Sequence, residues 1–250
     1  MELIPIKIKK ILPPKDDLFA KITQSSFKPK TGDVICISSK VIAIHEGQCV
    51  EGGDRVAKES LAKKIADKYV THEYGQGRRA LFTLTQGVLI RTAGIDESNG
   101  NGYFILWPKD PHASATFFKR VIEKKYKIKL QGVVVTDSYS VPLRRGASGF
   151  ALGWAGISPI KDYRGTKDVF GRKIKITVAN VVDALASAAT LVMGESGAST
   201  PVCIVRGIVL PKEKKNAPAL DQMPVPPEDD IFSRFILSQK WKLTKKKKTI

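Results

Sequence analysis

The segment Gln131-Gly132-Val133-Val134-Val135-Thr136-Asp137 has the composition of a buried β-strand. Its consecutive valines favour extended structure, because branched side chains pack well on a pleated surface. We expect the strand to end at Asp137, which is followed by Ser138 and a polar loop. Strand ends of this kind are common locations for metal or phosphate sites. The segment therefore predicts a core strand with a candidate site beside it.

Strand-like and helix-like patterns alternate along the rest of the chain. Further strands are expected at residues 3–8, 34–38, 41–44, within 81–107, at 174–177 and at 201–210. Helices are expected at residues 15–23, 57–70, 112–127 and 181–193, with a short one within 229–237. Residues 148–157 are rich in Gly and Ala and are expected to be loop-like. The alternation predicts an α/β or mixed α+β fold.

Length and cysteine content place the chain among ordinary globular proteins. It has 250 residues, 42% of them hydrophobic, which is enough for a proper apolar core. No apolar run reaches the roughly 20 residues of a membrane span, and we expect no signal peptide. The cysteines, Cys36, Cys49 and Cys203, include no C-x-x-C pair. They predict reduced thiols in a cytoplasmic protein and no zinc site.

The net charge of +18 indicates that the chain attracts anions. Nucleotides and phosphorylated cofactors are the first candidates. Nucleic acid is a less favoured partner, because the sequence has no zinc finger and no aromatic RNA-binding motif. A Lys-rich, solvated surface is the alternative explanation. No Walker A motif occurs, so any nucleotide must be held by another arrangement.

Four oxygen-bearing side chains are candidate metal ligands. Asp96 lies in a loop rich in Gly and Asn, Asp137 and Ser138 follow the valine run, and Glu195 follows an expected helix. Carboxylate and hydroxyl oxygens suit a hard cation such as Mg²⁺. The alternative is that Asp96 caps a turn and Glu195 is merely solvated.

A cationic cluster follows Asp137 in the sequence. Arg144 and Arg145 come a short loop after Asp137, and Arg164 and Lys167 lie in the next loop-like region. Arginine forks bind phosphate and carboxylate in a bidentate manner, as phosphoryl transfer requires. The alternative is a basic surface loop paired with its own aspartates.

Seven segments carry a resemblance to a known family. They are 37–41 (ISSKV), 46–47 (EG), 93–99 (AGIDESN), 142–146 (PLRRG), 162–172 (DYRGTKDVFGR), 191–195 (LVMGE) and 226–232 (PPEDDIF). Together they resemble the F420:γ-glutamyl ligases from about residue 3 to residue 235. The segment 162–172 is the most specific of them.

The resemblance implies a fold, a reaction and an assembly. The fold would be a mixed α/β architecture with mixed and antiparallel sheets, assembled as an intertwined homodimer. GTP would phosphorylate a carboxylate of coenzyme F420-0, and the amine of L-glutamate would attack the acyl phosphate, with Mg²⁺ or Mn²⁺ bound. The ligase region would span residues 1–210, as one or two subdomains. From composition, residues 211–238 are expected to form an extended segment with a short helix, and residues 239–250 a disordered Lys-rich tail.

The resemblance also assigns roles to individual residues. Asp96 and Asp137 would hold one metal ion, and Ser138 and Glu195 would serve a second. The nucleotide contacts would come from Leu12, Pro13, Ser39, Lys40 and Asn99. The cations expected to act in catalysis are Arg144, Arg145, Arg164 and Lys167, which with the metals would screen the phosphoryl group from the reacting carboxylate.

Departures from the family pattern surround the proposed metal ligands. The family usually has Thr where Ser138 stands and often Gln where Glu195 stands. The Gly-Arg of its Asp-Thr-x-Gly-Arg-Pro motif is replaced by Ser140-Val141, and its Asp-Glu-Leu-Ala reads Asp183-Ala184-Leu185-Ala186. Two alternatives therefore stay open: the same chemistry on a different phosphorylated acid, and a non-catalytic homologue that binds nucleotide or RNA.

Overall fold

The computed structural model describes residues 1–213 and 223–244, and the chain divides into two compact units. Unit 1 contains residues 1–47 and 108–213, and unit 2 contains residues 48–107 and 223–244. The expected ligase region, 1–210, is therefore shared between the units. No helix in the described part of the chain is long and apolar enough to cross a membrane.

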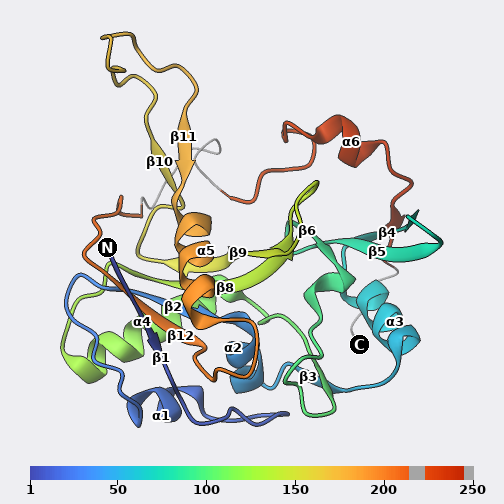
Figure 1. Ribbon diagram of the computed structural model, residues 1–250, viewed down its shortest axis with the longest axis horizontal. Helices are drawn as coiled ribbons and strands as arrows, with labels where there is room; N and C mark the ends of the chain where they lie inside the picture. The colour runs from blue at the N-terminus through green and yellow to red at the C-terminus, as the bar shows by residue number, and fades with distance from the viewer. Residues whose placement is uncertain (214–222, 245–250) are drawn as a thin grey trace. The chain divides into compact units, whose positions relative to one another are not determined.

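Unit 1 is built on a five-stranded mixed sheet with the strand order β1-β12-β2-β8-β9 (Figure 1). The strands are β1 (Glu2–Ile6), β2 (Val34–Ser38), β8 (Gly132–Ser140), β9 (Ala147–Ala155) and β12 (Val202–Arg206). β2 pairs with β8 in parallel, and the other neighbours are antiparallel. Near-continuous burial of the three central strands indicates that both faces of the sheet are covered.

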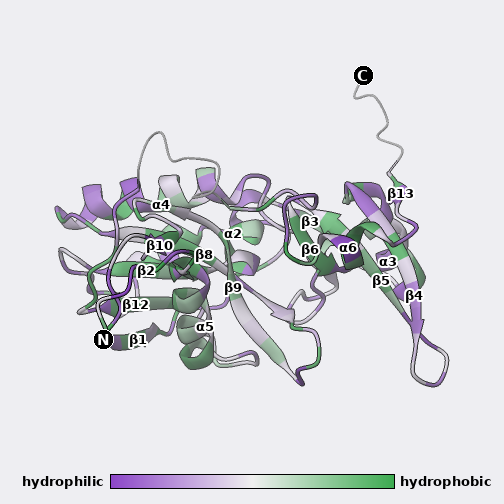
Figure 2. Cartoon of the chain, turned by 90° about the horizontal axis from the view of Figure 1, so that it is seen from above, coloured by the Kyte–Doolittle hydropathy of each residue, from purple (hydrophilic) through white to green (hydrophobic). Residues whose placement is uncertain are grey.

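Helices cover the two faces of this sheet (Figure 2). The longest, α4 (Pro111–Tyr126), packs on β8 and β9 from one face, and α5 (Val181–Met193) packs on the same strands from the other. Two shorter helices, α1 (Leu18–Thr23) and α2 (Ser39–Glu46), contact each other, and α2 contacts β2 and β8. The expected helices at 112–127 and 181–193 are confirmed.

Two glycines of β9 allow both helices to approach the strand. A Cβ on Gly149 would lie 2.2 Å from Thr190 Oγ1 of α5. A Cβ on Gly153 would lie 2.5 Å from the carbonyl carbon of Pro111 in α4. The Gly/Ala-rich segment 148–157, expected to be loop-like, is therefore mostly strand. Its small residues reflect helix contact on both sides.

Gly153→Ala is expected to destabilise the protein by about 1–3 kcal/mol, the usual cost of forcing an extra methyl into a packed core. The clash is with backbone of Pro111, which cannot move as a flexible side chain can. Urea unfolding would measure the change in the free energy of unfolding. Gly197→Ala is the control, because nothing lies within 4 Å of its Cβ position. Equal effects of the two substitutions would contradict the packing argument.

The segment 41–44, expected to be a strand, is part of helix α2. Its apolar run is too short for periodicity to distinguish strand from helix. The helix begins at Ser39, directly after β2, and ends at Glu46; its C-cap, Gly47, adopts the left-handed conformation with φ of 73°. Gly at this position is the common terminator of a helix.

An ion pair between Arg206 and Asp33 joins the end of β12 to the turn before β2. Arg206 donates from Nε and Nη2 to the two carboxylate oxygens of Asp33, at 2.9 and 2.7 Å. Asp33 is only 1% exposed, and the hydrogen bond to it raises the pKa of Arg206. A bidentate geometry of this kind fixes the end of β12 against the turn before β2.

Unit 2 contains a four-stranded sheet with the order β13-β4-β5-β6 and a separate β3–β7 pair. Its elements are β3 (Cys49–Glu51), α3 (Arg55–Ile65), β4 (Lys68–Tyr74), β5 (Arg78–Thr85), β6 (Val88–Arg91), the 3-10 turn η1 (Thr92–Gly94), β7 (Tyr103–Ile105), α6 (Ser233–Leu237) and β13 (Lys242–Leu243). The helix expected at 57–70 ends at Ile65, and the chain continues as β4. The hydrophobic core of unit 2 includes Ala62, Leu81, Ile95 and Phe104.

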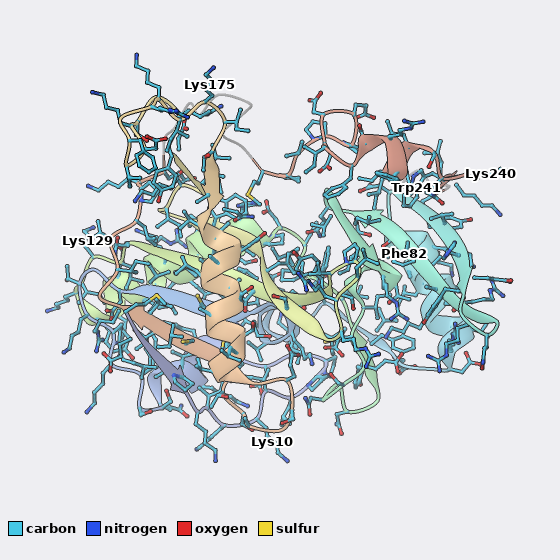
Figure 3. The ribbon with its side chains drawn as sticks, turned by 45° about the horizontal axis from the view of Figure 1, so that its top comes forward. Lys10, Phe82, Lys129, Lys175, Lys240 and Trp241 are labelled. Atoms are coloured by element: carbon cyan, nitrogen blue, oxygen red, sulfur yellow. The ribbon has the colours of Figure 1, made fainter. Side chains whose placement is uncertain are left out.

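Part of the expected disordered tail has regular structure. Lys242 and Leu243 form β13, paired antiparallel with β4. Trp241 Nε1 donates to the carbonyl of Ile236 in α6 at 2.7 Å, and Thr244 Oγ1 donates to the carbonyl of Lys63 at 2.9 Å. Figure 3 labels Trp241 beside α6. Residues 245–250, the Lys-rich end, lie outside the described residues.

Candidate active site

Asp137 and Ser138 lie inside β8, which continues to Ser140 and does not end at Asp137. Asp137 pairs with Phe150 of β9, and Ser138 pairs with Gly149. Because successive strand residues point to opposite faces, and Gly149 faces α5, Ser138 lies on the α5 face and Asp137 on the other. Both are half-buried, and the Ser138 N–H donates to Asp137 Oδ1 at 2.8 Å.

Arg144 and Arg145 occupy the turn that joins β8 to β9. Both are exposed, and the Arg144 N–H closes the turn by donating to the Val141 carbonyl at 3.2 Å. Leu143 beside them has a φ of 59° and is fully exposed. The structure therefore brings this arginine pair and Asp137 onto one β-hairpin.

Arg164 and Lys167 lie in a second hairpin, formed by β10 (Ile160–Asp162) and β11 (Val178–Asn180). Arg164 donates from Nε and Nη2 to Asp162, at 2.9 and 2.8 Å. The alternative in which this arginine pairs with its neighbouring aspartate is thus present in the structure. Lys167 is exposed. Figures 1 and 3 show the hairpin extending away from the sheet of unit 1, and Figure 3 labels Lys175 in it.

Two of the predicted metal ligands lie in loops. Glu195 is exposed directly after Gly194, the C-cap of α5. Asp96 belongs to unit 2, where its Oδ1 accepts from the N–H and the hydroxyl of Ser98 at 2.7 and 2.8 Å. The turn-capping role considered for Asp96 is therefore also present.

The donor set fits a hard divalent cation. Its groups are carboxylate and hydroxyl oxygens, which Mg²⁺ and Mn²⁺ prefer over nitrogen and sulfur. Within residues 1–213 and 223–244, no three His, Cys, Asp or Glu side chains gather into a ready-made metal cage. Mg²⁺ commonly needs only one or two protein carboxylates, since water and substrate phosphates complete its coordination.

The predicted nucleotide contacts lie in three places. Leu12 and Pro13 precede α1, and the Leu12 N–H donates to Asp16 at 2.8 Å. Ser39 and Lys40 form the first turn of α2, which packs against α1 in the same unit. Asn99 belongs to unit 2 and has a φ of 57°.

The thiols are unsuited to nucleophilic catalysis. Cys36 and Cys203 are fully buried and directly opposite each other on β2 and β12. Burial raises the pKa of Cys203 to about 11, and burial followed by the nearby Cys203 raises the pKa of Cys36 further. Burial also raises the pKa of Cys49. All three cysteines are free, as expected.

Sequence reasoning did not select Asp183 as a site residue. From the first turn of α5, its Oδ1 accepts the N–H of Ala151 in β9 at 2.9 Å. Burial and then the charge of Asp183 raise the pKa of Tyr139, which adjoins Ser138. The spacing from Asn180 to Asp183 indicates a helix N-terminus, but no sequence signal shows the contact to β9.

The comparisons with known proteins agree on one family. The family described as F420-0:gamma-glutamyl ligase matches residues 5–207. The coenzyme F420:L-glutamate ligase of Methanopyrus kandleri is 31% identical, covering 93% of this chain and 97% of its own length. The protein of that name from Archaeoglobus fulgidus is 32% identical, with 94% and 98% covered. The one from Methanocaldococcus jannaschii is 34% identical, with 80% and 84% covered.

Proposed function

Because the chain belongs to the F420-0:gamma-glutamyl ligase family and is a ligase of coenzyme F420 biosynthesis, we propose that it joins L-glutamate to a carboxylate of F420-0 using GTP and Mg²⁺ or Mn²⁺. The observation that carries this proposal is the extent of the similarity. The family match covers residues 5–207, and two relatives with this activity in their names align over more than nine-tenths of both chains.

The reaction needs an activated carboxylate. A carboxylate oxygen is a poor leaving group, so the γ-phosphoryl group of GTP first passes to it, releasing GDP and giving an acyl phosphate. The amino nitrogen of glutamate then attacks the carbonyl carbon. An amide bond forms, phosphate leaves, and the nitrogen loses a proton to a base or to water. Charge on several oxygens must be neutralised throughout.

The proposed site residues would divide this task by their chemistry. Asp96, Asp137, Ser138 and Glu195 would hold divalent metal, which when bound supplies positive charge against the phosphate oxygens. The guanidinium and ammonium groups of Arg144, Arg145, Arg164 and Lys167 would bind the transferred phosphoryl group and the acceptor carboxylate. The nucleotide would be contacted by Leu12, Pro13, Ser39, Lys40 and Asn99. Support for these roles comes from the oxygen-rich donor set and from the shared β8–β9 hairpin.

Mass spectrometry of the products from F420-0, L-glutamate, GTP and Mg²⁺ tests the proposal. A mass increase of one or more glutamyl residues, dependent on GTP, is the expected result. GTP cleavage that requires a different phosphorylated acid would identify another acceptor. This outcome is considered because Ser140-Val141 replaces the Gly-Arg of the family motif. Nucleotide binding without cleavage in the presence of any acceptor acid would favour the non-catalytic alternative.

A homodimer is part of the same proposal. The β10–β11 hairpin exposes Val169, Phe170 and Ile176 at 92%, 87% and 85%, and three such side chains on one extended hairpin favour burial against a second chain. Sedimentation equilibrium is expected to give twice the chain mass of 27.4 kDa. Replacing Val169 and Phe170 by Ser should shift the protein towards monomer, and a monomeric wild type would remove this part of the proposal.

Arg145→Lys is expected to lower kcat for glutamate addition by roughly tenfold or more. Lysine keeps the charge but lacks the planar fork, and one lost charge-assisted hydrogen bond costs about 1.5 kcal/mol or more. Steady-state kinetics would measure kcat and KM. The control is Lys161→Arg, the reverse substitution at an exposed position. Unchanged kinetics in Arg145→Lys would make this arginine an ordinary surface residue.

A further inference from the structure

One irregularity sets the register of the outer half of the β8–β9 hairpin. Val135 pairs with Gly153, but the next pair is Thr136 with Ala151, so Leu152 is an extra residue in β9. A bulge of this kind shifts the alternation of the bulged strand by one residue. Gly149 and Gly153 accordingly face opposite helices, although they are four positions apart and would share a face in a regular strand.

The bulge is held from outside the hairpin by Asp183. The N–H of Ala151 donates to Asp183 Oδ1 at 2.9 Å. Oδ2 of the same carboxylate accepts from Asn180 Nδ2 at 2.6 Å, and the Asp183 N–H donates to Asn180 Oδ1 at 3.0 Å. One oxygen is therefore engaged by the bulge and the other by the N-cap of α5. The carboxylate joins the helix terminus to the strand irregularity.

A second contact from the same helix face holds β9 nearby. Ser187, four residues after Asp183, donates from Oγ to the carbonyl of Gly149 at 2.6 Å. Residues at i and i+4 of a helix lie one above the other, so both side chains reach the same strand. Their hydrogen bonds to β9 are at Gly149 and Ala151, on either side of Phe150. Phe150 is the residue opposite Asp137.

We propose that Asp183 is a positioning residue for ligation, which holds the β9 bulge and thereby the register that aims Asp137. Without this acceptor, the Ala151 N–H loses its partner and the outer hairpin can slip by one residue. A one-residue slip turns every side chain of the slipped segment to the opposite face. Asp183 acts through the hairpin and does not touch the reacting atoms. The inference rests on the role that the proposed function gives Asp137.

Three variants separate positioning from general stability. Asp183→Ala removes the acceptor. Asp183→Asn keeps an oxygen that can accept the Ala151 N–H. Asn180→Ala removes the N-cap of α5 and the contact to Asp183 Oδ2 but keeps Oδ1 as the acceptor for the Ala151 N–H, so it is the control for helix stability. For each variant, kcat and KM for F420-0 would be measured beside amide hydrogen exchange of residues 136–151 and the melting temperature.

Asp183→Ala is expected to lower kcat at least about tenfold, the usual effect of removing a group that orients a metal ligand. Exchange should accelerate across residues 136–151, Asn should recover most of the lost rate, and Asn180→Ala should melt lower with kcat nearly unchanged. Wild-type kcat in Asp183→Ala, unchanged exchange, or a failure of Asn to recover activity would each overturn the inference. Absence of glutamylated product from the wild type would overturn the proposed function instead, and hydrogen exchange would then decide alone whether Asp183 holds the bulge.

Discussion

Asp137→Asn is expected to reduce kcat for glutamate addition by more than about 100-fold, because loss of a direct metal ligand should exceed the 10–100-fold cost of losing a group that only supports one. Asparagine has nearly the same shape and can still accept the Ser138 N–H that bonds to Oδ1. The charge is the principal property that changes. The melting temperature should therefore stay within about 4 °C, the shift that corresponds to roughly 1 kcal/mol in a chain of this size.

Ser140→Ala is the matched control for this result. Ser140 is the last residue of the same strand and is exposed, so its substitution tests whether any change in outer β8 impairs turnover. It should keep nearly full activity. If Asp137→Asn retains activity within about twofold of wild type, a difference of less than 0.5 kcal/mol in barrier height, Asp137 is not a metal ligand.

The fold was predictable where a pattern was long enough to show its period. Helices α4 and α5 are recognisable from apolar spacing, and β2 and β12 from short β-branched runs. The run at 41–44 was assigned wrongly because four apolar residues fit a strand and a buried helix equally well. Strand β9 was not predicted, because its small residues are required by the close packing of helices on both faces of the strand. These are tertiary contacts, which the local sequence does not show.

Some features of the candidate site were also predictable from the sequence, and others were not. That Arg144 and Arg145 follow Asp137 after a short loop is visible in the sequence, and the structure places all three on one hairpin. The Arg164–Asp162 pair was anticipated as an alternative, since the two residues are neighbours. The contact of Asp183 with Ala151 depends on a one-residue bulge, which changes the register without changing the composition.

GTP binding is expected to collapse when divalent metal is removed. The chain has no Walker A motif, so the backbone amides and lysine that balance phosphate charge in a P-loop are missing. Bound metal must supply that charge, and a contribution of several kcal/mol corresponds to roughly 100-fold or more in affinity. Calorimetry with Mg²⁺ and then with EDTA would measure the difference. Replacing both Asp96 and Asp137 by Asn should reproduce the effect of EDTA.

The net charge of +18 supports a rival account, in which any polyanion simply adheres to a basic surface. That account predicts a steep dependence on salt, indifference to metal, and equal binding of ATP and GTP. The two accounts predict opposite changes in GTP affinity for the double Asn variant, because this variant removes two negative charges. A metal site then loses GTP, whereas a basic surface holds it as tightly or more so. Glu51→Gln with Glu73→Gln makes the same change in charge at exposed positions and should leave metal-dependent binding intact. If the double Asn variant binds GTP as well as this control does, the metal assignment fails and the non-catalytic alternative gains support.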